Sequence, residues 1–150
     1  MLEVFALDDE IKRIETKEEV SAYLARLKYA LNHGAKIDFQ IIRQVDAGRP
    51  VIYSNRFTIA DLFPHEDPLM VLKRELLSLS VAEYISTNRD INYPNRSEMR
   101  VFGKVYEGTK EVYIKIRVVL LGAIEHSPVF VMSFHYTTTP FKREMFPYKD

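Results

Sequence analysis

Residues 111–121 of the chain read EVYIKIRVVLL, and this stretch decides the fold. Aliphatic side chains at positions 112, 114, 116 and 118 alternate with Tyr113, Lys115 and Arg117. Successive side chains of a strand point to opposite faces, so the pattern predicts a strand with one apolar and one polar face. Residues 100–106 and 129–136 are also rich in Val, Ile, Tyr and Phe. The sequence therefore predicts a C-terminal three-stranded antiparallel meander, with a hairpin turn at residues 107–110 and a loop at residues 122–128.

Helical patterns precede this meander. Thr16 and Glu19 have the spacing of a capping box, and an apolar stripe follows them. They predict a helix over residues 16–32, which Gly34 ends. Asp67 and Pro68 predict the first residues of a second helix that runs to about residue 79, with a further turn over residues 81–85.

The remaining segments carry weaker patterns. Residues 36–43 and 51–55 are predicted as short strands separated by a turn at 46–50, and residues 57–62 as a short helical piece. Residues 86–99 are polar and rich in turn formers, which predicts a loop. Helices followed by strands predict an α+β fold with the helices packed on one face of the sheet. The 150 residues are expected to form a single domain.

The composition excludes several classes of protein. A chain with 47% hydrophobic residues is not disordered, and a chain without cysteine has neither disulfide bonds nor a thiol nucleophile. No apolar run approaches membrane-spanning length, and the acidic N-terminal stretch does not resemble a signal peptide, so a soluble cytoplasmic protein is expected. Residues 1–83 have a net charge of −3 and residues 84–150 of +3, which suits a small cationic site rather than a DNA-binding domain.

The polar face of the meander is the candidate site. A hairpin centred near Glu125 would pair Lys115 with His135, Arg117 with Ser133 and Tyr113 with Thr137. Arg100 and Lys104 of the preceding strand share one parity and are expected beside this row. Such a cluster can hold a phosphodiester and move a proton near neutral pH, and RNA supplies its own 2′-hydroxyl nucleophile. The predicted catalytic residues are His135, Tyr113 and Lys115, and the predicted substrate-binding residues are Arg100, Lys104 and Arg117.

Simpler interpretations stay open for the same residues. An outward row of Lys, Arg and Tyr is usually a solvated sheet face, and a histidine at a strand end is often a structural hydrogen-bonding group. The same face could also bind RNA or a protein without cutting anything. His33 is expected at a helix end, His65 in a turn and His126 in a loop. No pair of histidines has metal-ligand spacing, so neither a metal nor a cofactor is expected. Common nucleotide-binding motifs and the hydrolase nucleophile elbow are absent from the sequence.

Several short motifs, in this order, are similar to those of a known family. Residues 57–149 resemble the MqsR-like branch of the RelE-type ribonuclease toxins of bacterial toxin–antitoxin systems. The matching pieces are residues 57–62, Leu76-Leu-Ser-Leu-Ser80, Glu83-Tyr84, Asp90, Val101-Phe-Gly-Lys104, Glu111-Val-Tyr-Ile-Lys-Ile116, Met132-Ser-Phe-His135 and Phe146-Pro-Tyr-Lys149.

This resemblance implies a fold and an activity. Members of the family fold as a curved antiparallel sheet backed by N-terminal helices. They cut messenger RNA as metal-independent endoribonucleases and are held inactive by a cognate antitoxin. By this resemblance Lys115 and Arg100, with Lys104, would hold the scissile phosphate, and His135 would act as general acid or general base. Tyr113 would orient the phosphate or share the proton transfer.

Overall fold

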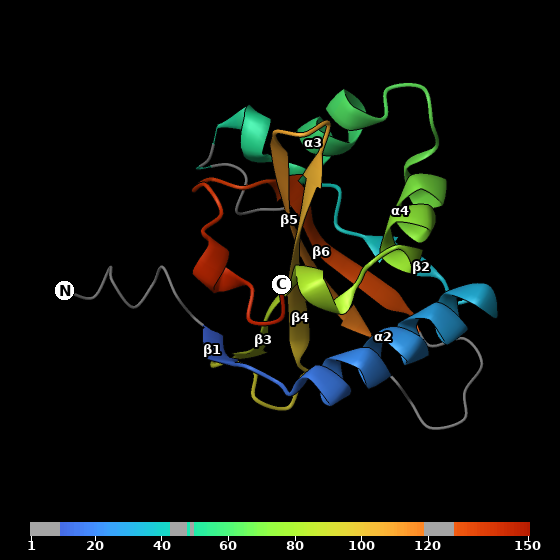
Figure 1. Cartoon of the computed structure of the whole chain (residues 1–150). Helices are drawn as coiled ribbons and strands as arrows, with labels where there is room; N and C mark the ends of the chain where they lie inside the picture. The colour runs from blue at the N-terminus through green and yellow to red at the C-terminus, as the bar shows by residue number, and fades with distance from the viewer. Residues whose placement is uncertain (1–9, 43–47, 49, 119–127) are drawn as a thin grey trace.

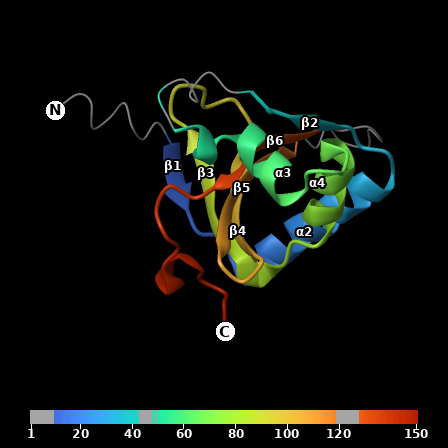
Figure 2. The same ribbon diagram turned by 90° about the horizontal axis from the view of Figure 1, so that it is seen from above.

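The computed structural model describes residues 10–42, 48, 50–118 and 128–150. Within them, one sheet of six strands has the order β1-β3-β4-β5-β6-β2, and the helices lie on one side of it (Figure 1, Figure 2). The strands are β1 (Glu10–Arg13), β2 (Ile37–Phe39), β3 (Tyr84–Asp90), β4 (Met99–Tyr106), β5 (Lys110–Val118) and β6 (Val129–Tyr136). The predicted α+β class is confirmed.

The meander predicted from residues 100–136 forms the centre of this sheet. β4, β5 and β6 pair antiparallel in sequence order, and the turn between β4 and β5 has positive φ angles at Glu107 (52°) and Gly108 (79°). The predicted loop at residues 122–128 lies almost wholly outside the described residues. β2 runs parallel to β6, so the sheet is mixed rather than wholly antiparallel.

Three α-helices are described, together with short 3₁₀ turns. They are α2 (Lys17–Asn32), α3 (Asn55–Leu62) and α4 (Pro68–Leu77), with η2 (Val51–Tyr53), η3 (Val81–Glu83) and η4 (Arg143–Met145). The capping box of α2 forms as predicted, because the Glu19 amide donates to the Thr16 hydroxyl and the Thr16 amide donates to the Glu19 carboxylate. Gly34 follows α2 with φ 86°, a conformation that glycine adopts without strain.

The apolar rows predicted from the sequence meet in one core. Alternate residues of β5, from Val112 to Val118, are at most 6% exposed. They pack against the buried stripe of α2 and against α4, where Leu72 and Leu76 are fully buried. Leu69, at the start of the predicted α4 stripe, is instead 48% exposed. Burial of these side chains, worth roughly 1.5–3 kcal/mol each, fixes which face of the sheet the helices cover.

Several predictions of local structure are wrong. Residues 86–90, predicted as part of a loop, and residues 84–85, predicted as part of a helical turn, form β3, because this segment pairs with β1 on one side and β4 on the other. Residues 51–55 form η2 and the first residue of α3 rather than a strand, because the Ser54 hydroxyl accepts from the Phe57 amide and caps a helix there. The strand predicted over residues 36–43 contains only β2, and most of the turn predicted at 46–50 lies outside the described residues.

Asn55 fastens α3 to the sheet. It is 1% exposed, and its amide nitrogen donates to the carbonyl oxygens of Gln40 (2.6 Å) and Met132 (3.0 Å). Its side-chain oxygen accepts from the Phe134 amide at 2.9 Å. These bonds lie at a register shift between β5 and β6, where the backbone groups of Met132 leave the regular ladder. They thereby hold the part of β6 that contains His135.

Candidate functional site

The sheet face that points away from the helices carries the predicted catalytic residues. Tyr113 of β5 pairs with His135 of β6, and their rings stack with centroids 5.5 Å apart and planes inclined by 24°. Lys115 is the next residue of β5 on this face and pairs with Ser133. The structure therefore brings Tyr113, His135 and Lys115 together, which is the grouping expected from the sequence.

The predicted pairing register is nevertheless wrong by two residues. His135 was expected opposite Lys115, whereas it lies opposite Tyr113, and Ser133 lies opposite Lys115 rather than Arg117. The sequence between β5 and β6 does not fix the centre of the predicted hairpin. This offset of two residues keeps Ser133 and His135 on their predicted face. Beyond Lys115 a register shift makes the offset three residues, so Val129 and Val131 lie on the helix side of the sheet and are fully buried.

An acidic side chain from the N-terminal strand holds Lys115. The Lys115 ammonium donates to Glu10 Oε2 at 2.8 Å, and the Asn88 amide donates to Glu10 Oε1 at 2.8 Å. Ser86 in turn donates to the Asn88 side-chain oxygen. Burial raises the pKa of Glu10, but the Lys115 charge and the hydrogen bonds outweigh it and keep that pKa below its usual value. Glu10 therefore stays ionised and fixes the position of the Lys115 ammonium.

The geometry of His135 decides where its proton lies. Nδ1 is 2.9 Å from the carbonyl oxygen of Tyr136, and a carbonyl oxygen only accepts. Nδ1 therefore carries the proton, and in the neutral imidazole the lone pair is on Nε2. His135 is 7% exposed and the Lys115 side chain 11%, so the site is recessed rather than fully solvated.

Arg117 extends the same face toward the loop between β3 and β4. Arg117 is two residues after Lys115 on β5, so both side chains lie on the same face, and it pairs with Phe130 of β6. Its Nε is buried and has no hydrogen-bond partner among the described residues. This predicted substrate-binding residue thus shares a face with the predicted catalytic residues.

The expectation that Arg100 and Lys104 lie beside this row is wrong. In the register of β4 with β5, Arg100 pairs with Ile116 and Lys104 with Val112, so both point to the helix side of the sheet. The alternation of side chains along one strand shows which of its residues share a face. Only the register with the neighbouring strand shows on which side of the sheet that face lies.

Both of these residues are held by other groups. Arg100 pairs with buried Glu15 at 2.8 Å and lies over the Tyr23 ring, 4.4 Å from its centroid. Lys104 donates to Glu83 Oε2 and to the Ser78 hydroxyl, each at 3.1 Å. Their role here is to tie the helices and the β3 start to the sheet.

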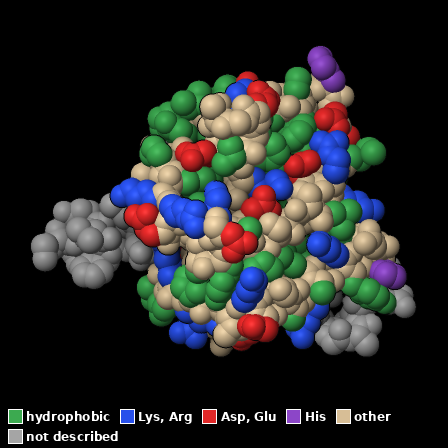
Figure 3. Space-filling view, viewed as in Figure 1, with side chains coloured by type: hydrophobic (Ala, Val, Ile, Leu, Met, Phe, Trp, Pro, Cys, Tyr) green, Lys and Arg blue, Asp and Glu red, His purple; other side chains and the backbone are tan. Residues whose placement is uncertain are grey.

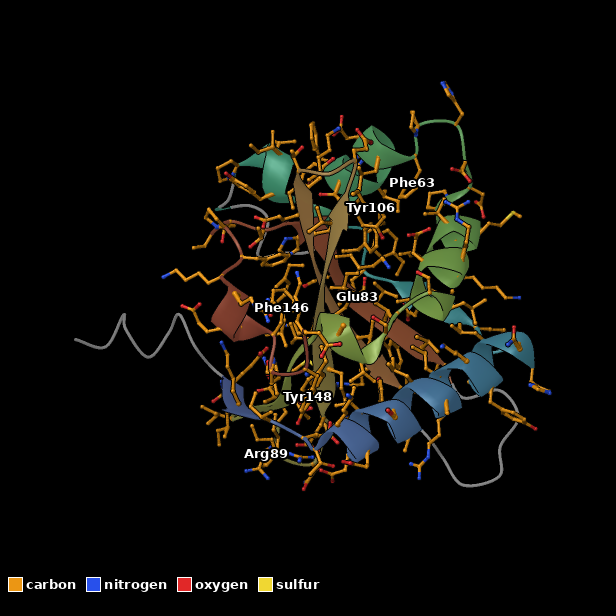
Figure 4. All side chains as sticks on the ribbon, viewed as in Figure 1. Phe63, Glu83, Arg89, Tyr106, Phe146 and Tyr148 are labelled. Carbon is orange, nitrogen blue, oxygen red and sulfur yellow. The ribbon has the colours of Figure 1, made fainter. Side chains whose placement is uncertain are left out.

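The C-terminal segment packs beside the candidate site. Gly103 pairs directly with Tyr113, and a Cβ atom placed on it would lie 2.9 Å from ring atoms of Phe141 and Phe146. The Phe141 amide donates to the Glu111 carboxylate, and Tyr148 stacks on Tyr84, with ring centroids 6.1 Å apart. Figure 4 labels Phe146 and Tyr148 on this segment. The absence of a side chain at position 103 thus lets the two phenylalanine rings approach β4.

Replacing Gly103 by alanine is expected to lower the free energy of unfolding by about 1–3 kcal/mol, because the added methyl group overlaps the Phe141 and Phe146 rings. Limited trypsin digestion should then cleave faster after Lys142 and Arg143. Val105→Ala is the control, since Val105 lies on the same face of β4 and is 51% exposed. Equal unfolding and digestion of the two variants would contradict this packing.

Charge on the molecular surface is mixed rather than concentrated. Figure 3 shows Lys and Arg interspersed with Asp and Glu over the face viewed. Among the described residues, no group of three or more His, Asp or Glu side chains could hold a metal ion. None of the helices in this part of the chain has the length and apolar character needed to cross a membrane.

Two supporting residues escaped the sequence analysis. Glu10 belongs to none of the helices, strands or motifs predicted from the sequence, and its partner Lys115 is far along the chain. Gly103 belongs to the Val101-Phe-Gly-Lys104 motif, but a glycine in a strand does not reveal what packs on it.

Comparisons with models of protein families, with curated proteins and with solved structures found no match. The function is therefore inferred from the geometry and chemistry of the site.

Proposed function

We propose that this protein is a metal-independent endoribonuclease toxin that cleaves mRNA in the cytoplasm and is neutralised by a cognate antitoxin. One observation carries the proposal. A stacked Tyr113–His135 pair and the Lys115 ammonium share one face of two adjacent strands. This set supplies a proton acceptor, a proton donor and a fixed positive charge, which are the groups that cleavage of RNA by its own 2′-hydroxyl requires.

The chemistry follows from the atoms present. His135 Nε2 takes the proton of the 2′-hydroxyl, and the 2′-oxygen attacks the adjacent phosphorus. The bond from phosphorus to the 5′-oxygen breaks, and that oxygen takes a proton from Tyr113 or from the imidazolium. The products are a 2′,3′-cyclic phosphate and a free 5′-hydroxyl. Lys115 stabilises the additional negative charge on the phosphate oxygens.

Fewer basic side chains are proposed to bind the substrate phosphate than the sequence predicts. Arg100 and Lys104 face the helices and are paired with Glu15 and Glu83, so they are removed from the phosphate-binding set. Lys115 and Arg117 remain on the face of Tyr113 and His135. This smaller set fits a single phosphodiester better than a long nucleic-acid groove.

The experiment is cleavage of a single-stranded RNA by the purified protein in EDTA, with and without ribosomes. We expect wild type to release fragments with a 2′,3′-cyclic phosphate, and a substrate with 2′-deoxy sugars to stay intact. Lys115→Ala should lose at least 10²-fold in rate, whereas Lys36→Ala, an exposed lysine, should not. Intact RNA in both wild-type reactions would overturn the proposal.

A non-catalytic RNA- or protein-binding module is the second candidate. The observation in its favour is that Lys115 already has a carboxylate partner and His135 is 7% exposed. In that case wild type would shift the mobility of RNA, or capture a partner protein, without producing fragments. Growth arrest on expression, reversed by Lys115→Ala, distinguishes the toxin from this module.

A further inference from the structure

The loop between β3 and β4 places an arginine and an exposed tyrosine near Arg117. The Arg96 guanidinium lies 3.8 Å from the centroid of the Tyr93 ring, and these side chains are 51% and 53% exposed. The loop has a defined shape, because the Asn92 amide donates to the Asp90 side chain and the Arg96 amide donates to the Tyr93 carbonyl. Arg96 and Tyr93 are thus presented together on an ordered turn.

Arg117 lies at the same end of the sheet as this loop. The loop ends at Met99, the first residue of β4, and Arg100 pairs with Ile116, the neighbour of Arg117. Burial, followed by the positive charge of Arg96, lowers the pKa of Arg117, although Asp90 and Glu10 act in the opposite direction. The Arg117 Nε is buried without a hydrogen-bond partner in the described part of the chain, and the Arg96 guanidinium is near it, so a bound anion would be favourable here.

We infer that Arg117, Arg96 and Tyr93 form a subsite for the nucleotide next to the scissile phosphate of a single-stranded RNA. The inference rests on the proposed ribonuclease function, which it deepens. The two guanidinium groups bind the neighbouring phosphate, and the exposed Tyr93 ring stacks on the base. Asp90, 3.9 Å from Arg96, holds the loop arginine near this position.

The spacing along β5 supports this assignment. Lys115 and Arg117 are alternate residues of one strand, so they stand about 6.5–7 Å apart on the same face. When one RNA phosphate is held at Lys115, the next phosphate along the RNA is therefore within reach of Arg117. Stacking on an aromatic ring is how single-stranded RNA is commonly recognised, and it tolerates any base. An acidic peptide would use the two arginines but would have no use for the Tyr93 ring.

The test measures binding without cleavage. A fluorescent single-stranded oligonucleotide with 2′-O-methyl sugars cannot be cut, so its anisotropy reports affinity alone. We expect Arg96→Ala, Arg117→Gln and Tyr93→Ala each to weaken binding about tenfold. Each arginine variant should also reduce the slope of log affinity against log salt by about 0.7. Arg117→Lys keeps the charge in case the glutamine variant does not fold, and should weaken binding less.

Arg89→Ala is the matched control. Arg89, labelled in Figure 4, is an exposed arginine near the same loop. It shares the parity of Thr87, which pairs with Arg100, and therefore lies on the helix side of the sheet. Wild-type affinity in this variant, with weaker binding in the others, supports the subsite. Wild-type affinity in Arg96→Ala and Tyr93→Ala overturns it, as does equally tight binding of polyglutamate that depends on the same residues.

The two proposals can fail separately. If natural RNA is cut but the loop variants bind the 2′-O-methyl oligonucleotide like wild type, the ribonuclease stands and the subsite is wrong. If the loop variants lose binding but natural RNA is never cut, the subsite stands as an RNA-binding site and the ribonuclease is wrong.

Discussion

Replacing His135 by alanine is expected to lower the rate of RNA cleavage by about 10²–10⁴-fold, the range for loss of one general acid–base group. The reason is that Nδ1 is committed to the Tyr136 carbonyl, so Nε2 is the atom that can accept the 2′-hydroxyl proton. The measurement is the single-turnover rate with saturating protein, which reads the chemical step rather than binding. His65→Ala, an exposed histidine in a turn, serves as the control and should cleave like wild type.

Since His135 is buried and stacks on Tyr113, a second variant separates chemistry from folding. His135→Gln preserves much of the side-chain volume and a polar end group, but it cannot act as an acid–base group near neutral pH. Both variants should bind the 2′-O-methyl oligonucleotide as wild type does. Full cleavage by a folded His135→Gln protein would remove His135 from the mechanism.

Loss of the Glu15 carboxylate is expected to lower the free energy of unfolding by about 3–5 kcal/mol, the cost of breaking a buried ion pair from one side. Glu15 is 5% exposed, and its carboxylate accepts from Arg100 Nε at 2.8 Å, from Arg100 Nη2 at 3.2 Å and from the Thr87 hydroxyl. Glu15→Ala would leave the Arg100 guanidinium without that partner. Urea unfolding measures the loss, and Glu18→Ala, an exposed glutamate at the start of α2, should change stability far less.

The same carboxylate predicts a dependence of stability on pH. Burial raises the pKa of Glu15, but the hydrogen bonds from Arg100 and Thr87 and the charges of Arg100 and Arg13 outweigh it and hold the pKa below its usual value. Stability from Glu15 is therefore complete above its unfolded pKa of about 4.3 and is lost as pH falls through the lower folded pKa. Glu15→Gln should flatten this part of the curve of unfolding free energy against pH. An unchanged curve would show that Glu15 is not ion-paired in solution.

Local signals in the sequence predicted much of the fold. The capping box at Thr16, the Asp67-Pro68 helix start and the alternation along β5 depend on neighbours within a few residues, and each is confirmed. The alternation also placed Tyr113, Lys115 and Arg117 on one face. What these signals share is that their physical cause lies within one turn of helix or one strand.

The parts that could not be predicted depend on distant partners. β3 contains Ser86, Thr87 and Asn88, which are typical of loops, and they are buried because Glu10 and Glu15 from the N-terminal region bind Asn88 and Thr87. The faces of Arg100 and Lys104 depend on register, which a sequence of alternating residues leaves open. The resemblance to a toxin family suggested an activity, but it did not indicate which cations remain available to a substrate.

The order of strands in the sheet has a consequence for biosynthesis. β1 and β2 are made first, yet they form the two outer edges, against β3 and β6. In a growing chain β1 can pair only after β3 has been made, and β2 only after β6, the last strand, has left the ribosome, and such non-local pairing is slow. Tyr113 and Lys115 of β5 meet His135 and Ser133 only when β6 pairs, so the site of the proposed ribonuclease is assembled only when synthesis is nearly complete.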